Sequence, residues 1–381
     1  MALSCVPHWR LSSFYFSYFA LLGVIAPYWS LYLIDSGLSA VEVSYIAAAM
    51  MATKIISPYI LGLIADLSGK PVLVVRISSL ISLIAFFGIF YADGFLPILL
   101  VVILFGFFWN AEIGQFEAIT LSSLGKNNSY YGKVRSWGSI GFILAVVGLG
   151  LFFSKYSISL LPMVMTFLLA MILLSSFMVS DKKNTGSISK DNSIKKILSN
   201  KNVLIFFLVC FLVQVAHGPY YTYFSIYLSE FGFSNSTIGI LWAFSVIPEI
   251  FMFVFMSNLQ QRFSFKAILI ISLSVNMIRW SMVALFGESL ILLFISQLGH
   301  AFTFASFHAI SVQWIRKTFT IGTQGQGQAL YSALSFGFGG AVGALLSGYL
   351  WSLSHLYIWY FAAAIGLLAT SLLLFSFNED S

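Results

Sequence analysis

Charged residues are scarce in this chain. They make up 8% of its 381 residues, whereas an ordinary soluble domain carries about 25%. Hydrophobic residues supply 59% of the sequence, and the mean hydropathy is +0.94. This balance excludes a soluble fold and predicts a protein that lies largely within the lipid bilayer.

Cysteine is nearly absent as well. Cys5 and Cys210 are the only two, and one of them lies inside an apolar run, so a disulfide framework and a cysteine metal site are both excluded. The sequence contains no H-E-x-x-H motif, no G-x-S-x-G elbow and no phosphate-binding glycine loop, which argues against an enzyme. We expect neither a metal nor an organic cofactor.

The sequence is rich in long uncharged apolar runs, such as 11–34, 202–229 and 289–315. Each is long enough to cross a hydrocarbon core of about 30 Å as a helix. A transmembrane β-barrel is excluded because its strands would alternate polar and apolar residues. We therefore predict an all-α membrane protein with spans near 9–34, 42–64, 72–91, 95–123, 131–154, 159–179, 203–228, 236–257, 266–285, 289–315, 325–350 and 354–376.

The positive charges are distributed unevenly between the two sides of these spans. Of the 19 Lys and Arg residues, fifteen fall on one side and only Lys155 on the other. By the positive-inside rule, the rich side is cytoplasmic and both termini lie there. We expect a multi-pass protein of the inner (cytoplasmic) membrane, and the net charge of +6 then reflects membrane topology and not nucleic-acid binding.

A polar stretch rich in Lys, Ser and Asn divides the spans six and six. It predicts an N-terminal six-helix bundle at 1–180, a cytoplasmic linker at 181–201 and a C-terminal six-helix bundle at 202–381. The segment Tyr32-Leu-Ile-Asp-Ser-Gly-Leu-Ser39 recurs as Tyr227-Leu-Ser-Glu-Phe-Gly-Phe-Ser234. A repeat with the same sidedness is typical of two parallel halves.

The segment from Gly62 to Lys70 contains Asp66 and Gly69 at the spacing G-x-x-x-D-x-x-G-K. It resembles the loop signature of the major facilitator superfamily, where it follows the second span. Together with the repeat, this resemblance implies two pseudo-symmetric six-helix bundles, alternating access and a monomer. Asp66 and Lys70 can then hold a charge contact that opens as the halves rock.

Six charged residues within or at the mouth of the predicted spans are candidates for a buried site. A charge at the centre of a span costs about 2.5–3.5 kcal/mol on insertion scales, so such residues line a cavity or pair with each other. The six are Lys54, Glu112, Glu117, Arg135, Glu249 and Arg279.

Glu117 and Arg135 are eighteen residues apart on neighbouring spans. They resemble the sugar-binding Glu and Arg of lactose permease. The stretch Tyr131-Gly-Lys-Val-Arg-Ser-Trp-Gly-Ser139, with Ala216-His-Gly-Pro-Tyr-Tyr221 and Arg279-Trp280, resembles the bacterial 3-phenylpropionate permease branch more closely. This resemblance implies an aromatic carboxylate as substrate, although the pair can also be a simple brace between two helices.

In the second half, Glu249, Arg279 and His300 resemble the Glu, Arg and His that serve lactose permease in sugar binding and proton coupling. The pattern departs from that family because Thr303 stands where a carboxylate is expected, and Gln297 stands at the position of a charged residue. Proton coupling needs a group whose proton affinity changes with its surroundings. Glu249 is the first candidate, with Glu117 and His300 as alternatives.

Three further residues are candidates for the substrate pocket. Lys54 can line the pocket or extend its ammonium towards an interface. Tyr220 and Trp242 can stack on a substrate ring or simply pack in the core.

These observations predict a proton-coupled symporter that imports a small organic solute by alternating access, with an aromatic carboxylate such as 3-phenylpropionate as the favoured substrate. A sugar symporter, a nucleoside symporter and a proton-driven efflux carrier remain alternatives. A channel or a sensor would not need duplicated halves with ion pairs in both. The expected partners are the substrate, the proton and the lipid bilayer, and the proton gradient supplies the energy.

Overall fold

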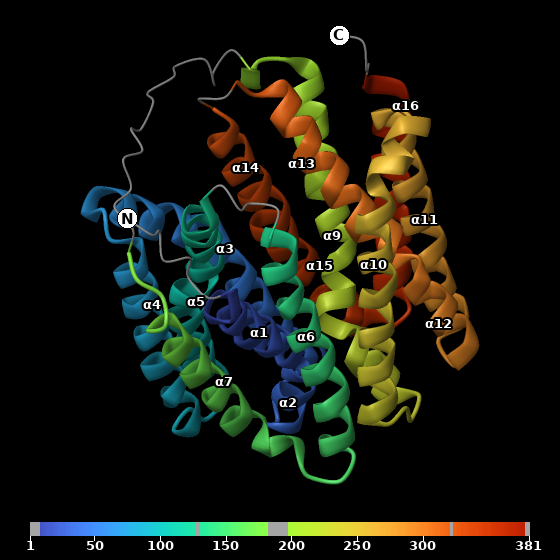
Figure 1. Ribbon diagram of the computed structural model, residues 1–381. Helices are drawn as coiled ribbons and strands as arrows, with labels where there is room; N and C mark the ends of the chain where they lie inside the picture. Colours follow the sequence, from blue (N-terminus) through green and yellow to red (C-terminus); the bar gives the residue numbers. More distant parts are fainter. Residues whose placement is uncertain (1–7, 126–129, 182–196, 321–322, 378–381) are drawn as a thin grey trace. The chain divides into compact units, whose positions relative to one another are not determined.

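The computed structural model describes residues 8–125, 130–181, 197–320 and 323–377 (Figure 1). Helices account for almost all of these residues, and the described part of the chain contains no β-strand. The chain divides into two compact units. One comprises Met1–Gly186 with Ser234–Gly239, and the other comprises Ser187–Phe233 with Ile240–Ser381. Most of the expected linker, 182–196, lies outside the described residues.

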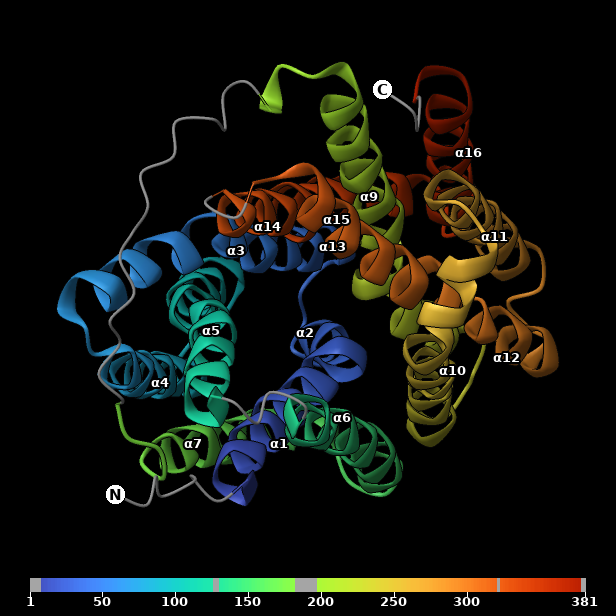
Figure 2. The same cartoon turned by 45° about the horizontal axis from the view of Figure 1, so that its top comes forward.

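The first unit begins with two helices that a π-helical stretch, Ile25–Trp29, joins into one span. Its helices are α1 (His8–Val24), α2 (Ser30–Asp35), α3 (Ala40–Ser68), α4 (Pro71–Phe87), α5 (Phe95–Leu124), α6 (Tyr131–Phe153) and α7 (Leu161–Ser176). α1 lies beside α6 and α7, and α5 packs against α3 and α4 (Figures 1 and 2).

The second unit contains two more π-helical stretches, Ala301–Ser306 and Ala333–Gly339, each of which joins two helices into one span. Its helices are α9 (Lys201–Glu230), α10 (Asn235–Arg262), α11 (Phe265–Leu285), α12 (Leu290–Leu298), α13 (Phe307–Thr318), α14 (Gln324–Ser332), α15 (Gly340–Leu353) and α16 (Tyr357–Ser376). α9 packs against α15 and α16, and α11 packs against α16.

Twelve helical segments in the described residues are long and apolar enough to cross a membrane. They confirm the twelve predicted spans in number and order. The ends of the spans differ from the predicted bounds more than the centres do. The second span was predicted at 42–64, whereas α3 extends over Ala40–Ser68.

The ends of α3 are set by capping residues, which hydropathy does not detect. The backbone N–H of Glu42 donates to Ser39 Oγ at 3.3 Å, and the backbone N–H of Ser39 donates to Glu42 Oε2 at 2.8 Å. This reciprocal capping box satisfies donors that the first turn leaves unpaired. At the other end Gly69 has a φ of +64°, which glycine adopts without steric cost and which terminates the helix.

One span is central in each unit. In the apolar centre of the α1 span 61% of the residues are buried, and in α9 the share is 83%, the highest value in each unit. A Cβ at Gly218 of α9 would overlap the backbone of Gly343 in α15, and a Cβ at Gly343 would overlap the carbonyl oxygen of Val215 in α9. The absence of side chains therefore permits this helix contact.

Candidate functional site

The charged side chains within the spans fall into separate groups in the two units. In the second unit they come from α10, α11 and the span that contains α12 and α13. An ionised group in the membrane interior needs partners, because hydrocarbon offers none. The contacts of Arg279 show how the second unit meets this need.

Arg279 of α11 is 1% exposed and hydrogen bonds to three side chains. Its Nη1 lies 2.8 Å from His300 Nδ1 and donates to Thr303 Oγ1 at 3.2 Å, while its Nη2 donates to Gln297 Oε1 at 3.1 Å. The guanidinium carbon also lies 4.4 Å from the ring centre of Tyr220, where an aromatic face attracts a cation.

The protonation of His300 follows from these contacts. Arginine has no acceptor atom, so His300 Nδ1 accepts the hydrogen bond from Arg279 and carries no proton. The ring proton is therefore on Nε2, which lies 3.0 Å from Glu249 Oε1 and donates to it. The result is a directed chain of hydrogen bonds from Arg279 through a neutral His300 to Glu249.

Helical spacing brings three of these partners onto one face. Gln297, His300 and Thr303 are separated by three residues each, so they share a face of their span. The π-helical stretch Ala301–Ser306 begins directly after His300 and packs against α11. Such π-turns interrupt the regular helix and occur often at functional sites.

We call Glu249, Arg279, Gln297, His300 and Thr303 the Arg279 network. Sequence reasoning named Glu249, Arg279 and His300 as candidate site residues, and the structure brings all three together. The sequence-based prediction places Glu249 directly beside Arg279, whereas in the structure His300 stands between the two. In the sequence, Gln297 and Thr303 stand out as departures from a related pattern. Their three-residue spacing from His300 was the signal that they share its role.

The two aromatic candidates of the second unit, Tyr220 and Trp242, are buried and pack on each other. Their ring centres are 4.4 Å apart. Tyr220 donates a hydrogen bond to Gln297 Oε1 at 3.0 Å, and Trp242 donates one to Ser225 Oγ at 3.0 Å. Tyr220 therefore supports the Arg279 network directly, and Trp242 supports Tyr220.

In the first unit, Glu117 of α5 and Arg135 of α6 form an open ion pair. Arg135 Nε lies 3.7 Å from Glu117 Oε1, and the side chains are 31% and 40% exposed. The Arg135 guanidinium also covers the ring of Phe19 at 3.9 Å. The partial exposure of both side chains leaves the pair accessible to a polar solute.

Lys54 of α3 is half-buried, and no described side chain forms an ion pair or hydrogen bond with its ammonium. Its neighbour Thr53 accepts a hydrogen bond from Asn110 at 2.8 Å and donates to the carbonyl of Met50 at 2.7 Å.

Glu112 of α5 is 1% exposed and accepts a hydrogen bond of 3.4 Å from Ser82.

The residues of the loop signature lie at the end of α3 and just after it. Gly62 and Asp66 are within the helix, Gly69 terminates it and Lys70 precedes α4. Asp66 and Lys70 are exposed, and no ion pair joins them in the described part of the chain. A side chain at Gly62 would contact Gln115 of α5.

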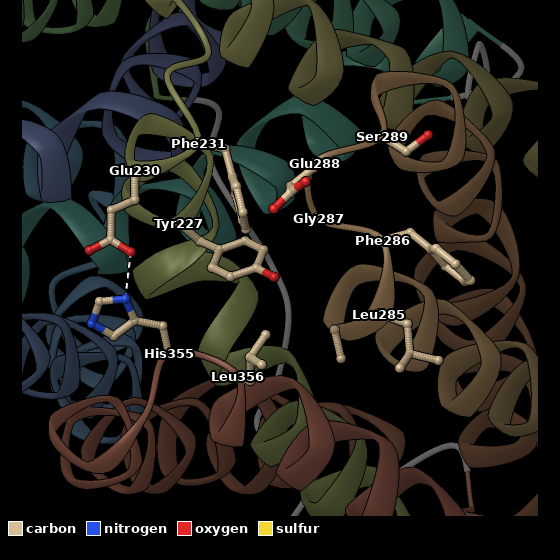
Figure 3. Close-up of a pocket in the computed structure, with 11 residues that line it drawn as sticks. Tyr227, Glu230, Phe231, Leu285, Phe286, Gly287, Glu288, Ser289, His355 and Leu356 are labelled. Carbon is tan, nitrogen blue, oxygen red and sulfur yellow. Dashed lines mark ion pairs between the residues drawn. The ribbon is translucent and has the colours of Figure 1, made fainter.

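The second unit also contains a cavity of about 650 Å³ that none of the sequence candidates lines. It lies between the end of α9 and the loops after α11 and α15, and Figure 3 shows Tyr227, Glu230, Glu288 and His355 around it. His355 Nδ1 lies 2.6 Å from Glu230 Oε2, and both side chains are more than 40% exposed.

Comparisons with known proteins agree over nearly the whole chain. The model of the MFS_1 like family matches residues 8–363. An Escherichia coli K12 protein described as "Probable 3-phenylpropionic acid transporter" is 26% identical over 91% of this chain and 92% of its own length. The maltose permease of Geobacillus stearothermophilus is 23% identical, with coverages of 94% and 93%.

Solved structures show the same fold. A crystal structure of a mutant of the nucleoside transporter NupG aligns with a TM-score of 0.89 at 18% identity, over 97% of this chain and 100% of that chain. The family match extends over all twelve spans in whole or in part. The chain therefore belongs to the MFS_1 like family of major facilitator transporters, and it is a multi-pass membrane transporter and not an enzyme.

Proposed function

We propose that this transporter is a proton-coupled symporter that imports a small aromatic carboxylate such as 3-phenylpropionate. It works as a monomer in the inner membrane with both termini in the cytoplasm. Two six-helix halves, 1–180 and 202–381, are joined by the linker 181–201 and open the carrier in turn to each side of the membrane. The substrate-binding residues we assign are Lys54, Glu117, Arg135, Tyr220, Trp242, Arg279 and His300, and the loop residues that accompany the motion are Gly62, Asp66, Gly69 and Lys70.

The observation that carries the proton-coupling proposal is the order of the hydrogen bonds in the Arg279 network. His300 cannot accept a second proton while Arg279 donates to its Nδ1, because two donors would then face each other. Glu249 is the one member of the network that can bind a proton without losing the contact between Arg279 and His300. We therefore assign the transported proton to Glu249.

Protonation of Glu249 changes the charge of the network. With Glu249 ionised, its negative charge balances the positive charge of Arg279, and the network is neutral. With Glu249 protonated, the guanidinium has no counter-charge, and a substrate carboxylate in the carrier restores neutrality. Proton and anionic substrate thus favour each other's binding, which is the reciprocal coupling that a symporter requires.

The substrate class rests on two supports. The E. coli relative is described as a probable 3-phenylpropionic acid transporter, and the spans include the candidate cations Lys54, Arg135 and Arg279, which suit a carboxylate. The alternative is a neutral solute. The maltose permease relative favours a sugar, and the NupG structure points to nucleosides. The accessible Glu117 and Arg135 pair suits hydroxyl groups in either case.

Uptake of radiolabelled 3-phenylpropionate, maltose and uridine into proteoliposomes tests this function. With an inward proton gradient, we expect the acid alone to accumulate above equilibrium, and a protonophore should abolish the accumulation. Accumulation of maltose or uridine and not the acid would show that the transported substrate is that neutral solute. Accumulation of the acid that survives the protonophore would reject proton coupling.

A further inference from the structure

Lys54 lies on a distinct face of α3. Residues Tyr45, Ile56 and Leu63 of this helix are exposed apolar side chains, as expected for a face in contact with lipid. A second face, which includes Thr53, is buried against α5. At 100° per residue, Lys54 lies opposite the exposed apolar face and at the edge of the buried one.

The strip that holds Lys54 lies opposite the exposed apolar face. Its residues nearest to Lys54, Ala47, Met51 and Pro58, are partly buried, whereas Leu61 and Ala65 further along the helix are buried. Pro58 has no backbone N–H, so the carbonyl of Lys54, four residues earlier, lacks its usual helical donor. A freed carbonyl within a span is tolerated where protein or a water-filled cavity surrounds it, and not where lipid does. The carbonyl of Lys54 therefore requires protein or water beside it and not lipid, and the ammonium requires polar surroundings.

The three candidate cations within the spans, Lys54, Arg135 and Arg279, are not equally paired. Arg135 has Glu117 at 3.7 Å, and Arg279 is connected to Glu249 through His300. Lys54 has no such partner among the described residues, and the adjacent Thr53 is already bonded elsewhere. An unpaired cation in a span is costly and marks a functional site by default, with an anion as its partner.

We propose that the Lys54 ammonium binds the carboxylate of the transported substrate and thereby makes the carrier selective for anions over neutral solutes. This inference rests on the proposed function and names the residue that sets its substrate class. Lys54 is only partly buried, so its ammonium can contact the substrate directly.

The test compares 3-phenylpropionate with its neutral amide, 3-phenylpropionamide, in proteoliposomes of the full-length protein. In Lys54→Met we expect the KM or Kd for the acid to rise at least tenfold, while the affinity for the amide changes less than about threefold. Lys54→Arg keeps the charge and should retain most of the affinity for the acid. Lys155→Met, which removes a cation between two spans, is the matched control. It should change the affinity for neither ligand.

Two outcomes overturn the inference while the proposed function stands. One is unchanged preference for the acid in Lys54→Met, and the other is an equal loss of acid and amide binding in that variant. If the wild-type protein accumulates maltose or uridine and not the acid, both the function and this inference fail.

A stability measurement keeps the test decisive. Removal of an unpaired charge from a span should leave the Tm of the ligand-free protein equal or higher. In addition, 3-phenylpropionate should raise the Tm of the wild type and not that of Lys54→Met. Should Lys54→Met not fold, the same comparison on Lys54→Gln decides the question.

Discussion

Glu249→Gln removes one negative charge from the Arg279 network and keeps the shape of the side chain. Hydrogen bonds of 2.8 and 3.0 Å on either side of the His300 ring separate Arg279 from Glu249. At an effective dielectric constant of about 20, unit charges about 8 Å apart interact by about 2 kcal/mol, which is roughly thirty-fold in a binding constant. An anionic substrate that replaces Glu249 as counter-charge can recover at most that amount.

The wild type should therefore bind 3-phenylpropionate more tightly as the pH falls and Glu249 becomes protonated, by up to roughly thirty-fold. Glu249→Gln resembles the protonated state at every pH. Its affinity should be high and independent of pH above about pH 6, where the substrate remains ionised. It should exchange substrate across the membrane and fail to accumulate it.

The assays are ligand titrations at pH 6 and pH 8, followed by uptake and exchange in proteoliposomes. Glu230→Gln, which changes a half-exposed acid that pairs with His355 and has no ion pair or hydrogen bond to the described members of the Arg279 network, is the control. Uphill accumulation by Glu249→Gln would refute the assignment of the proton to Glu249. A pH dependence of binding equal to that of the wild type would refute the charge argument.

Three further variants test other parts of the structure. Arg135→Lys should raise the KM for substrate about tenfold through loss of the planar guanidinium, and an unchanged KM removes Arg135 from the site. Gly218→Ala should destabilise the protein by about 1–3 kcal/mol through overpacking, which a lower Tm would show, whereas Gly114→Ala, with open space around it, should not. Glu230→Gln, which breaks the half-exposed pair with His355, should cost less than about 1 kcal/mol, and a larger drop in unfolding free energy contradicts this.

Much of the fold follows from the sequence because the membrane imposes one simple rule. Apolar runs of span length must be helices, so the number and order of the spans could be predicted. Helix ends could not, because capping groups such as Ser39 and Gly69 decide them. The π-helical stretches were also beyond prediction, since they arise from packing between helices and leave no periodic signal.

The candidate site could be predicted in part for a related reason. Charged residues are so rare in the spans that Glu249 and Arg279 are conspicuous in the sequence alone. Neutral partners such as Gln297 and Thr303 are not, because polar uncharged residues are common in these helices. The position of His300 between the two charges could be found only from the three-dimensional structure, because spacing along the sequence does not determine which residues of separate helices are in contact.

Substrate-dependent proton entry tests the central claim most directly. The purified protein is reconstituted into liposomes that contain a pH-sensitive dye, and 3-phenylpropionate is added outside without an imposed gradient. We predict internal acidification with the acid, none with its amide and none in Glu249→Gln. Transport of labelled acid without any acidification would contradict proton symport and with it the role assigned to the Arg279 network.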